Sequence, residues 1–527
     1  MDGRHSLVSG LQSLGRHSAC RRFLNAGNEA DATMPTVKRL TLSGLFALVM
    51  AGCFWRPTTV GGVEPTETAL PSNDPVKSAR VAEVHALDAS MWDAAMDIWR
   101  YSEPGYQEFK SSKRLIEFLG RHGFKIESPI AGMPTAFVAS YGSGRPVIAL
   151  LAEFYALPGL SQDDSPVQKA RPDSNYGHGC GHHLFGVASA SAAIALASQM
   201  KAGKIQGTVR VFGCPAEEGG SAKVFMARDG YFDDCDAALH WHPDDENVAG
   251  NRGAISRIAA KFCFHGQSAH AASAPEQGRS ALDAVELTNH AVQLLREHVP
   301  DSTRIHHVIT YGGDAPNVVP NYAEVYYYIR HPDSRTLRGL YERLVKCAKA
   351  GALATETRLE IDHQGGTVEM LPNTVLSEIG TRNLIEQNDQ KVLPDEMEFF
   401  ARLQQTLPAP MPLESLGSVK QQNDSKGRGS TDVSDVSWVT PTTGFAVACW
   451  LPGTPGHSWQ AVACGAQPLA RRGMNLAART LATTAFELFE NPKHLRAANQ
   501  ELERRLGSRK YEPLIGAEQT PPLDYRK

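Results

Sequence analysis

Apolar residues between about positions 81 and 255 recur with two different periods, which predict helices alternating with strands. Trp92, Met96 and Trp99 recur at the spacing of one helix face. Further helices are expected at about 111–122, 184–200 and 221–229. Strands are expected at 134–140, 146–152, 207–213 and 236–241. Because the strand at 146–152 is apolar almost throughout, it is typical of a sheet covered on both faces, and the pattern predicts an α/β fold.

The pattern changes between about 256 and 366. Val325, Tyr327 and Ile329 alternate there at the period of a strand. The expected order is a strand at 256–264, a helix at 279–298, strands at 304–311 and 322–330, a helix at 336–353 and a strand at 357–363. This β-α-β-β-α-β order is that of a ferredoxin-like unit.

We therefore expect a mixed sheet covered by helices, interrupted by an inserted ferredoxin-like α+β domain. The α/β domain would comprise 81–255 and 367–500, and the insert 256–366. A long helix with an apolar face is expected at about 471–490. The tail at 501–527 is predicted to be loosely held from about 507, because it is polar and rich in proline.

The start of the chain resembles a targeting segment. Lys38 and Arg39 precede an apolar run, 40–52, that is too short to span a bilayer. The run ends in Ala-Gly-Cys, which resembles the bacterial lipoprotein cleavage box and implies cleavage before Cys53 and lipidation there. Met34 is an alternative start. Residues 1–53 are thus predicted to be a signal region and 54–80 a tether, which implies the bacterial cell envelope, or the cytoplasm if the signal is not used.

Composition narrows the function classes. The formal net charge is −4, with 42% hydrophobic and 21% charged residues, which is typical of a soluble globular protein without the basic excess of a nucleic-acid binder. Nine cysteines in 527 residues are too few for a disulfide scaffold. No Gly-x-Ser-x-Gly follows a predicted strand, which disfavours a serine hydrolase.

Four separate segments carry side chains that bind metals. The candidate residues are His178, Cys180, His182 and His183 in the first segment, Glu217 and Glu218 in the second, His240 and His242 in the third, and His457 in the fourth. Thiolate and imidazole suit zinc, and imidazole also suits several other metals. Taken singly, each segment could equally be a solvated turn or hold a buried histidine.

The placement of the segments strengthens the metal hypothesis. Three of them follow predicted strands of one sheet, and open α/β sheets bind ligands beyond the carboxyl ends of their strands. Histidines two apart on a strand share a face, whereas adjacent carboxylates at a strand's end point in different directions. The set would hold two close metals and leave one carboxylate as a general base.

These residues, in this order, resemble the dinuclear metallopeptidase family of aminoacylases and glutamate carboxypeptidases, and within it the amidohydrolase subfamily. The similarity extends from about 85 to 490. It includes the motifs Leu150-Leu151-Ala152-Glu153, Ser430-Thr431-Asp432-Val433 and Gly453-Thr454-Pro455. The combination is specific, although each motif alone is not.

The resemblance implies roles for particular residues. The implied metal ligands are Cys180, His182, Glu218, His242 and His457, with His240 as the alternative to His242. Glu217 matches the general base, and His270 matches a histidine that reaches the active site of a partner subunit. Asn317 and Arg330 match substrate-contacting positions. Tyr155 departs from the family, which usually has aspartate there.

The resemblance further implies hydrolysis of N-acyl amino acids, with p-aminobenzoyl-glutamate as the first candidate substrate and dipeptides or other N-acyl amino acids as alternatives. Two divalent metal ions in each chain are expected, manganese or zinc, with cobalt as a third candidate. The insert would form a homodimer or a heterodimer. A non-catalytic envelope binding protein or partner subunit is the second alternative, which the presence of every implied ligand and of the base disfavours.

Overall fold

The computed structural model describes residues 75–250, 253–422, 427 and 429–526. The predicted signal region 1–53, its cleavage before Cys53 and positions 54–74 of the predicted tether lie outside these residues. Helix α1 (Pro75–Tyr101) begins within the predicted tether. The helix therefore starts earlier than its apolar period indicated, because its first turns are polar.

Among the described residues, the larger sheet has eight strands in the order β1-β2-β6-β3-β7-β14-β8-β13. Their bounds are Lys125–Glu127 (β1), Phe137–Ser143 (β2), Val147–Ala152 (β3), Gly207–Gly213 (β6), Ala237–Asp244 (β7), Asn247–Gly250 (β8), Val419–Gln422 (β13) and Thr442–Ala448 (β14). β3 runs parallel to β6 and β7, and β7 runs parallel to β14. These four neighbouring strands therefore end at one edge of the sheet. The short strands β4 (Leu157–Pro158) and β5 (Tyr176–Gly177) pair separately.

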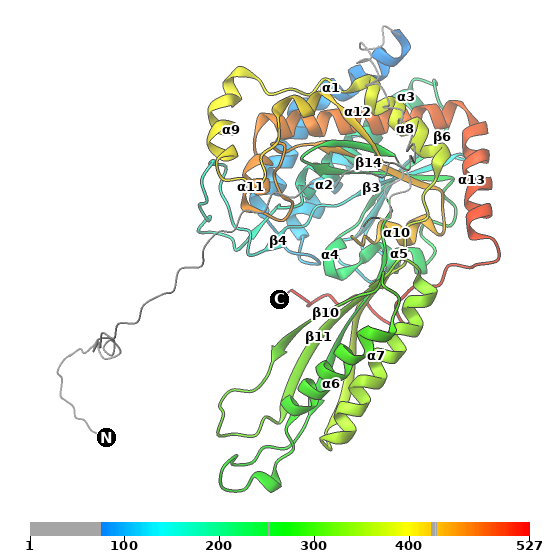
Figure 1. Ribbon diagram of the computed structural model, residues 1–527. Coiled ribbons are helices and arrows are strands. Elements are labelled where there is room, and N and C mark those ends of the chain that lie inside the picture. The colour runs from blue at the N-terminus through cyan, green and yellow to red at the C-terminus, as the bar shows by residue number, and fades with distance from the viewer. Residues whose placement is uncertain (1–74, 251–252, 423–426, 428, 527) are drawn as a thin grey trace, which may run out of the picture. The chain divides into compact units, whose positions relative to one another are not determined.

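Helices cover both faces of this sheet. Their bounds are Phe109–Gly120 (α2), His182–Lys201 (α3), Glu217–Gly220 (α4), Ala222–Arg228 (α5), Thr374–Gln387 (α8), Met397–Gln404 (α9), Val433–Ser437 (α10), Trp459–Cys464 (α11), Pro468–Glu490 (α12) and Pro492–Leu506 (α13). In β3, Ile148 and Leu150 join the core that α1, α3 and α12 cover, whereas Val147 and Leu151 face α5. Figure 1 shows α12, in orange, beside α1 and α3. The predicted α/β sheet with both faces covered is confirmed.

Helix α3 also passes a length and composition test for a membrane span, the one described helix to do so. It is the central helix of the larger core, with 89% of its apolar window buried. Apolar residues all round a helix are expected where neighbouring elements enclose it. The seven cysteines among the described residues are all free.

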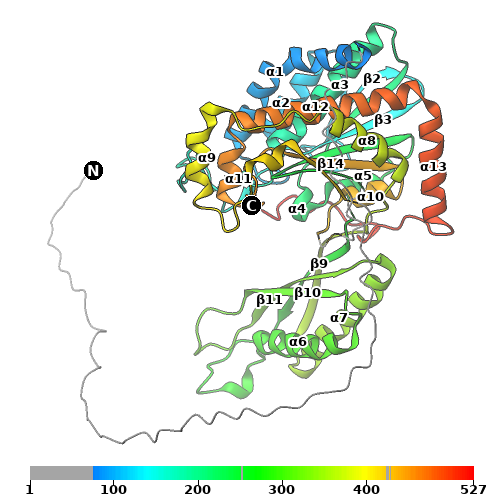
Figure 2. The same ribbon diagram turned by 45° about the horizontal axis from the view of Figure 1, so that its top comes forward.

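The inserted domain has the predicted β-α-β-β-α-β order. Its elements are β9 (Ser256–His265), α6 (Ala281–Leu295), β10 (Arg304–Tyr311), β11 (Tyr322–His331), α7 (Ser334–Ala354) and β12 (Arg358–Thr367). The four strands form an antiparallel sheet in the order β10-β11-β9-β12. Helices α6 and α7 lie side by side against it (Figure 2). The apolar residues of β11 that alternate in the sequence, including Val325 and Ile329, are the buried ones.

The end of the described chain differs from the prediction. Helix α13 extends to Leu506, so a tail boundary at 501 falls inside a helix. Beyond the helix, Leu514 and Ile515 are buried, with 3% and 7% of their surfaces exposed. The composition of this segment resembles a loose tail, but contacts with the rest of the fold hold it in place.

Candidate metal centre

The parallel strands deliver the candidate residues to one edge of the larger sheet. Glu153 follows β3, Glu217 and Glu218 lie just after β6, and His242 lies near the end of β7. His457 lies in the loop after β14. A cleft of about 700 Å³ opens there, and it is also lined by residues of the inserted domain. This volume is in the range of small-molecule sites.

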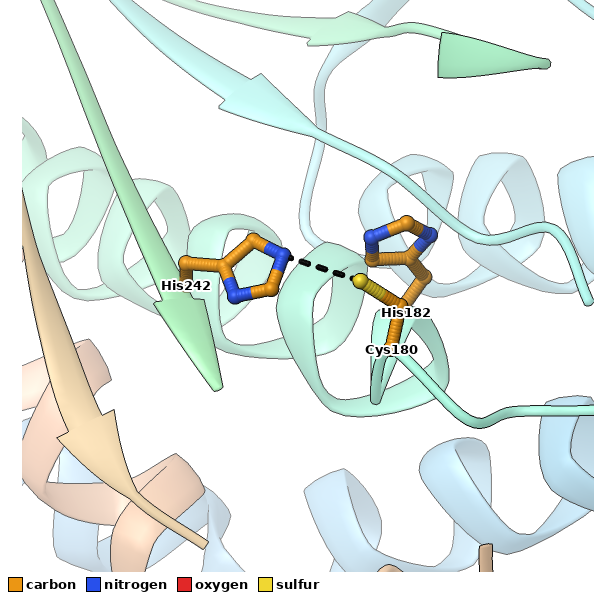
Figure 3. Close-up of side chains that lie close together, drawn as sticks. All are labelled: Cys180, His182 and His242. Atoms are coloured by element: carbon orange, nitrogen blue, oxygen red, sulfur yellow. Dashed lines mark hydrogen bonds between the residues drawn. The ribbon is translucent and has the colours of Figure 1, made fainter. Parts of the chain in front are cut away.

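Among the described residues, one group of possible metal donors combines Cys180, His182 and His242, whose donor atoms lie within 4.8 Å of one another. Cys180 Sγ is 3.2 Å from His242 Nε2 (Figure 3). Both ring nitrogens of His182 are buried and make no hydrogen bond within the described chain, although Nε2 lies 3.1 Å from Glu153 Oε2. Unpaired buried imidazole nitrogens beside a thiol fit a bound metal ion.

A second group combines Cys180, Glu218 and His457, again within 4.8 Å. His457 Nε2 lies 2.8 Å from Glu218 Oε1. Because Cys180 belongs to both groups, two ions held by them would be neighbours. The predicted ligands therefore lie together in a single cleft rather than scattered over the fold.

The structure separates the two candidate histidines of β7. Both point to the same side of the strand, opposite Trp241, but only His242 belongs to the donor group with Cys180. The His240 ring instead packs over Gly444 of β14, where an added Cβ would lie 2.2 Å from its Nε2. The geometry thus favours His242 as the ligand.

Two distant loops meet at this centre because glycine permits their close approach. An added Cβ at Gly179 would lie 3.3 Å from His457 Cα and 2.6 Å from Leu160 Cδ1. The backbone N–H of His457 donates to the Gly179 carbonyl at 2.9 Å. The glycines around Cys180 therefore let the first and fourth segments pack against each other.

The centre contains more buried acid groups than buried cations. Burial, with Asp432 and Glu218 nearby, raises the pKa of Glu217 to about 7. Burial and the neighbouring Glu218 and Glu217 raise the pKa of the Cys180 thiol, and burial lowers the pKa of His182. A neutral imidazole is the form that binds metals, and a nearby cation would favour the thiolate. The donor set is therefore electrostatically suited to divalent ions.

Tyr155 orients the candidate base. Its hydroxyl donates to Glu217 Oε2 at 3.2 Å and accepts from the Glu218 backbone N–H at 2.9 Å. Its ring lies 4.5 Å from the His182 ring, centroid to centroid. The tyrosine that departs from the family pattern thus contacts the candidate base and packs against a candidate ligand.

Lys223 supports the centre from below and was not predicted. Its ammonium, fully buried, lies 2.7 Å from Glu153 Oε1 and 2.7 Å from Asp432 Oδ1. Glu153 in turn lies beside His182, so the lysine helps to fix that ring through the carboxylate. A lone lysine in the short helix α5 carries no sequence signal of this role, although Asp432 and Glu153 both lie in family motifs.

Replacing Lys223 with methionine is expected to lower the free energy of unfolding by about 3–5 kcal/mol, because it leaves two buried carboxylates without their cation. Urea unfolding of both proteins in the same metal state measures the change. Arg358→Ala is the control, because its ion pair with Glu360 is more than half exposed and contributes less than about 1 kcal/mol. A loss for Lys223→Met as small as that of the control would contradict the structural role.

The predicted residues of the inserted domain are divided. Arg330 lines the cleft, and its Nη1 donates to Ser430 Oγ at 2.9 Å. His270 and Asn317 are exposed and do not line the cleft of their own chain. They lie in adjacent loops, where the Ala271 N–H donates to the Asn317 carbonyl at 3.0 Å. The role of His270 in a partner subunit stays a prediction. The cleft also contains Arg257 and Arg526, which were not predicted.

Comparisons with known proteins agree with this arrangement. Residues 250–356 match the model of a peptidase dimerisation domain. The chain is 38% identical to the B-type polypeptide of p-aminobenzoyl-glutamate hydrolase from Escherichia coli (strain K12), over 81% of this chain and 95% of the relative. It is 28% identical to the Xaa-Arg dipeptidase of Mus musculus, over 78% of this chain and 88% of the relative.

Solved structures show the same fold at low sequence identity. An aminobenzoyl-glutamate utilization protein from Klebsiella pneumoniae has a TM-score of 0.55 at 17% identity, covering 77% of this chain and 98% of that one. A dinuclear metal binding peptidase of the M20 family from Bacillus subtilis has a TM-score of 0.52 at 15% identity, covering 77% and 99%. With the identity to the Escherichia coli hydrolase and the converging donors, these findings show that the chain belongs to the M20 family of dinuclear metallopeptidases, as one of its metal-dependent amidohydrolases.

Proposed function

We propose that this amidohydrolase cleaves the amide bond of N-acyl amino acids whose amino acid is acidic, with p-aminobenzoyl-glutamate as the first candidate. The observation that carries the proposal is the meeting of the two donor groups with the spare carboxylate of Glu217 in one cleft. The name of the Escherichia coli relative supports the choice of substrate.

Two divalent ions, manganese or zinc with cobalt as a third candidate, would be held by Cys180, His182, Glu218, His242 and His457. When bound, they supply Lewis acidity that polarises the substrate carbonyl and acidifies water. Glu217 takes the proton of the attacking water and delivers it to the leaving nitrogen as the C–N bond breaks, which yields a carboxylic acid and an amine. Tyr155 holds Glu217 in position for both transfers.

Arginines of the inserted domain supply the acidic preference. Arg330 is held by Ser430 and stacks over Tyr328, 5.7 Å from the ring centroid. Arg257 also lines the cleft, with its guanidinium 4.9 Å from the same ring. Guanidinium groups bind carboxylates in a bidentate manner. This positive wall favours a substrate carboxylate and disfavours a dipeptide that ends in arginine.

A dipeptidase is the second candidate function, because relatives of this chain are named Xaa-Arg dipeptidases. The arginine-lined cleft restricts this alternative to dipeptides with an acidic or neutral second residue. Two of the relatives are named as different polypeptides of the same hydrolase, so we propose assembly through the inserted domain, as a homodimer or with a related chain. His270 and Asn317 of the partner subunit would then complete the cleft. A lipid anchor at Cys53 would place the enzyme in the cell envelope.

Metal-reconstituted protein is expected to release p-aminobenzoate from p-aminobenzoyl-glutamate, and a chelator is expected to abolish this release. Absorbance or chromatography of the freed amine measures the rate. The comparison panel contains p-aminobenzoyl-glutamine, N-acetyl-alanine and a dipeptide ending in arginine, all expected to react more slowly. Full activity in metal-free protein would end the mechanism, and faster cleavage of the arginine dipeptide would favour the dipeptidase.

A further inference from the structure

The segment that follows α13 returns to the cleft of the metal centre. Tyr511 donates through its hydroxyl to Asp435 Oδ1 at 2.9 Å. Further along, Arg228 Nη1 donates to the Gln519 carbonyl at 2.6 Å, and Gln107 Nε2 donates to the Leu523 carbonyl at 3.0 Å. Contacts with three separate parts of the fold therefore fix the path of this segment up to the cleft.

Tyr525 anchors the end of this path directly behind a candidate metal ligand. Its ring packs edge-on against Tyr106, with centroids 5.8 Å apart. It also covers Gly219, where an added Cβ would lie 2.7 Å from the tyrosine Cε2. Its hydroxyl donates to the Glu218 carbonyl at 3.1 Å. The glycine after Glu218 thus provides the space into which the tyrosine fits.

Arg526 follows this anchor and lines the cleft. Its Nη2 donates to the Glu218 carbonyl at 2.9 Å, and its guanidinium lies 5.1 Å from the Tyr525 ring centroid. Its Nη1 is buried and has no hydrogen-bond partner within the described chain. A buried guanidinium N–H is strongly favoured to find an acceptor. The site of the reaction therefore contains one oriented donor whose acceptor is not supplied by the described residues.

We propose that Arg526 binds a carboxylate of the substrate's amino acid and so determines specificity together with Arg330. The inference rests on the proposed function, because it assumes an N-acyl amino acid in the cleft. Arg330 comes from the inserted domain, whereas Arg526 comes from the segment packed against Glu218. Two guanidinium groups on separate elements match an amino acid with two carboxylates, such as glutamate.

The test compares Arg526→Ala, Arg526→Lys and Tyr525→Phe with wild type in the metal-loaded full chain. Each protein is assayed on p-aminobenzoyl-glutamate and on its two mono-amides, p-aminobenzoyl-glutamine and p-aminobenzoyl-isoglutamine. Arg526→Ala is expected to lower kcat/KM on the glutamate substrate about 10- to 100-fold, mainly through KM, and to have little effect on one of the amides. Arg526→Lys is expected to recover part of the loss.

Tyr525→Phe is the matched control, because its hydroxyl donates to the same Glu218 carbonyl without presenting a charge. Its effect is expected to be equal on all three substrates. If Arg526→Ala also lowers all three rates equally, the arginine only supports Glu218 and the inference is wrong. If Arg526→Ala changes none of them, the inference is wrong as well. A wild-type protein that cleaves none of these substrates would instead overturn the proposed function. Metal content and melting temperature, measured for each variant, separate these outcomes from loss of the fold.

Discussion

Glu217→Gln is expected to lower kcat by about 10²–10⁴-fold while the metal content stays unchanged, because the amide cannot take a proton from water. The side chain does not belong to either donor group, so its replacement leaves every candidate ligand in place. Burial and neighbouring acids raise the pKa of Glu217 to about 7, and a base with a pKa near the working pH is the most effective. Steady-state kinetics with metal analysis on the same samples measures both quantities.

Two further variants make this result specific. Tyr155→Phe removes the hydroxyl that contacts Glu217 but keeps the base, so a smaller loss of about 10- to 100-fold is expected. Glu218→Gln changes a candidate ligand one residue away and is expected to lower the metal content as well. Wild-type turnover in Glu217→Gln would remove this residue from its catalytic role, and loss of metal in that variant would show that Glu217 acts as a ligand instead.

His242→Ala is expected to remove about one metal equivalent from each chain and to lower kcat by about 10³-fold. The change leaves only Cys180 and His182 in the first donor group, and zinc sites normally need three protein ligands. A catalytic metal contributes several kcal/mol of transition-state stabilisation, and each 1.36 kcal/mol corresponds to a factor of ten. Elemental analysis after dialysis against limiting metal gives the stoichiometry.

His240→Ala is the matched comparison, because the two histidines lie two residues apart on the same face of β7. The His240 ring packs over Gly444 outside the donor groups, so this variant is expected to keep both metal equivalents. It also lines the cleft, so a change in KM is compatible with this expectation. The reverse pattern, with metal lost from His240→Ala and retained by His242→Ala, would exchange the two assignments.

The sequence alone was sufficient to predict the fold class and the gathering of the metal donors. Periodicity distinguishes helix from strand locally, and both the mixed sheet and the β-α-β-β-α-β insert followed from it. The donor segments could be grouped because parallel strands end at the same edge of a sheet. These inferences depend on local geometry and on the order of elements, both of which a linear pattern records.

Tertiary structure alone decided which of several equivalent residues lie in the cleft. His240 and His242 have the same period, and only the packing of β14 against β7 separates them. Lys223 has no local signal, because its two carboxylate partners are 70 and 209 residues away along the chain. The segment up to Arg526 resembles a loose tail in composition, yet long-range contacts bring it to Glu218. Contacts between residues distant in sequence depend on how elements pack, and a periodic pattern holds no information about that packing.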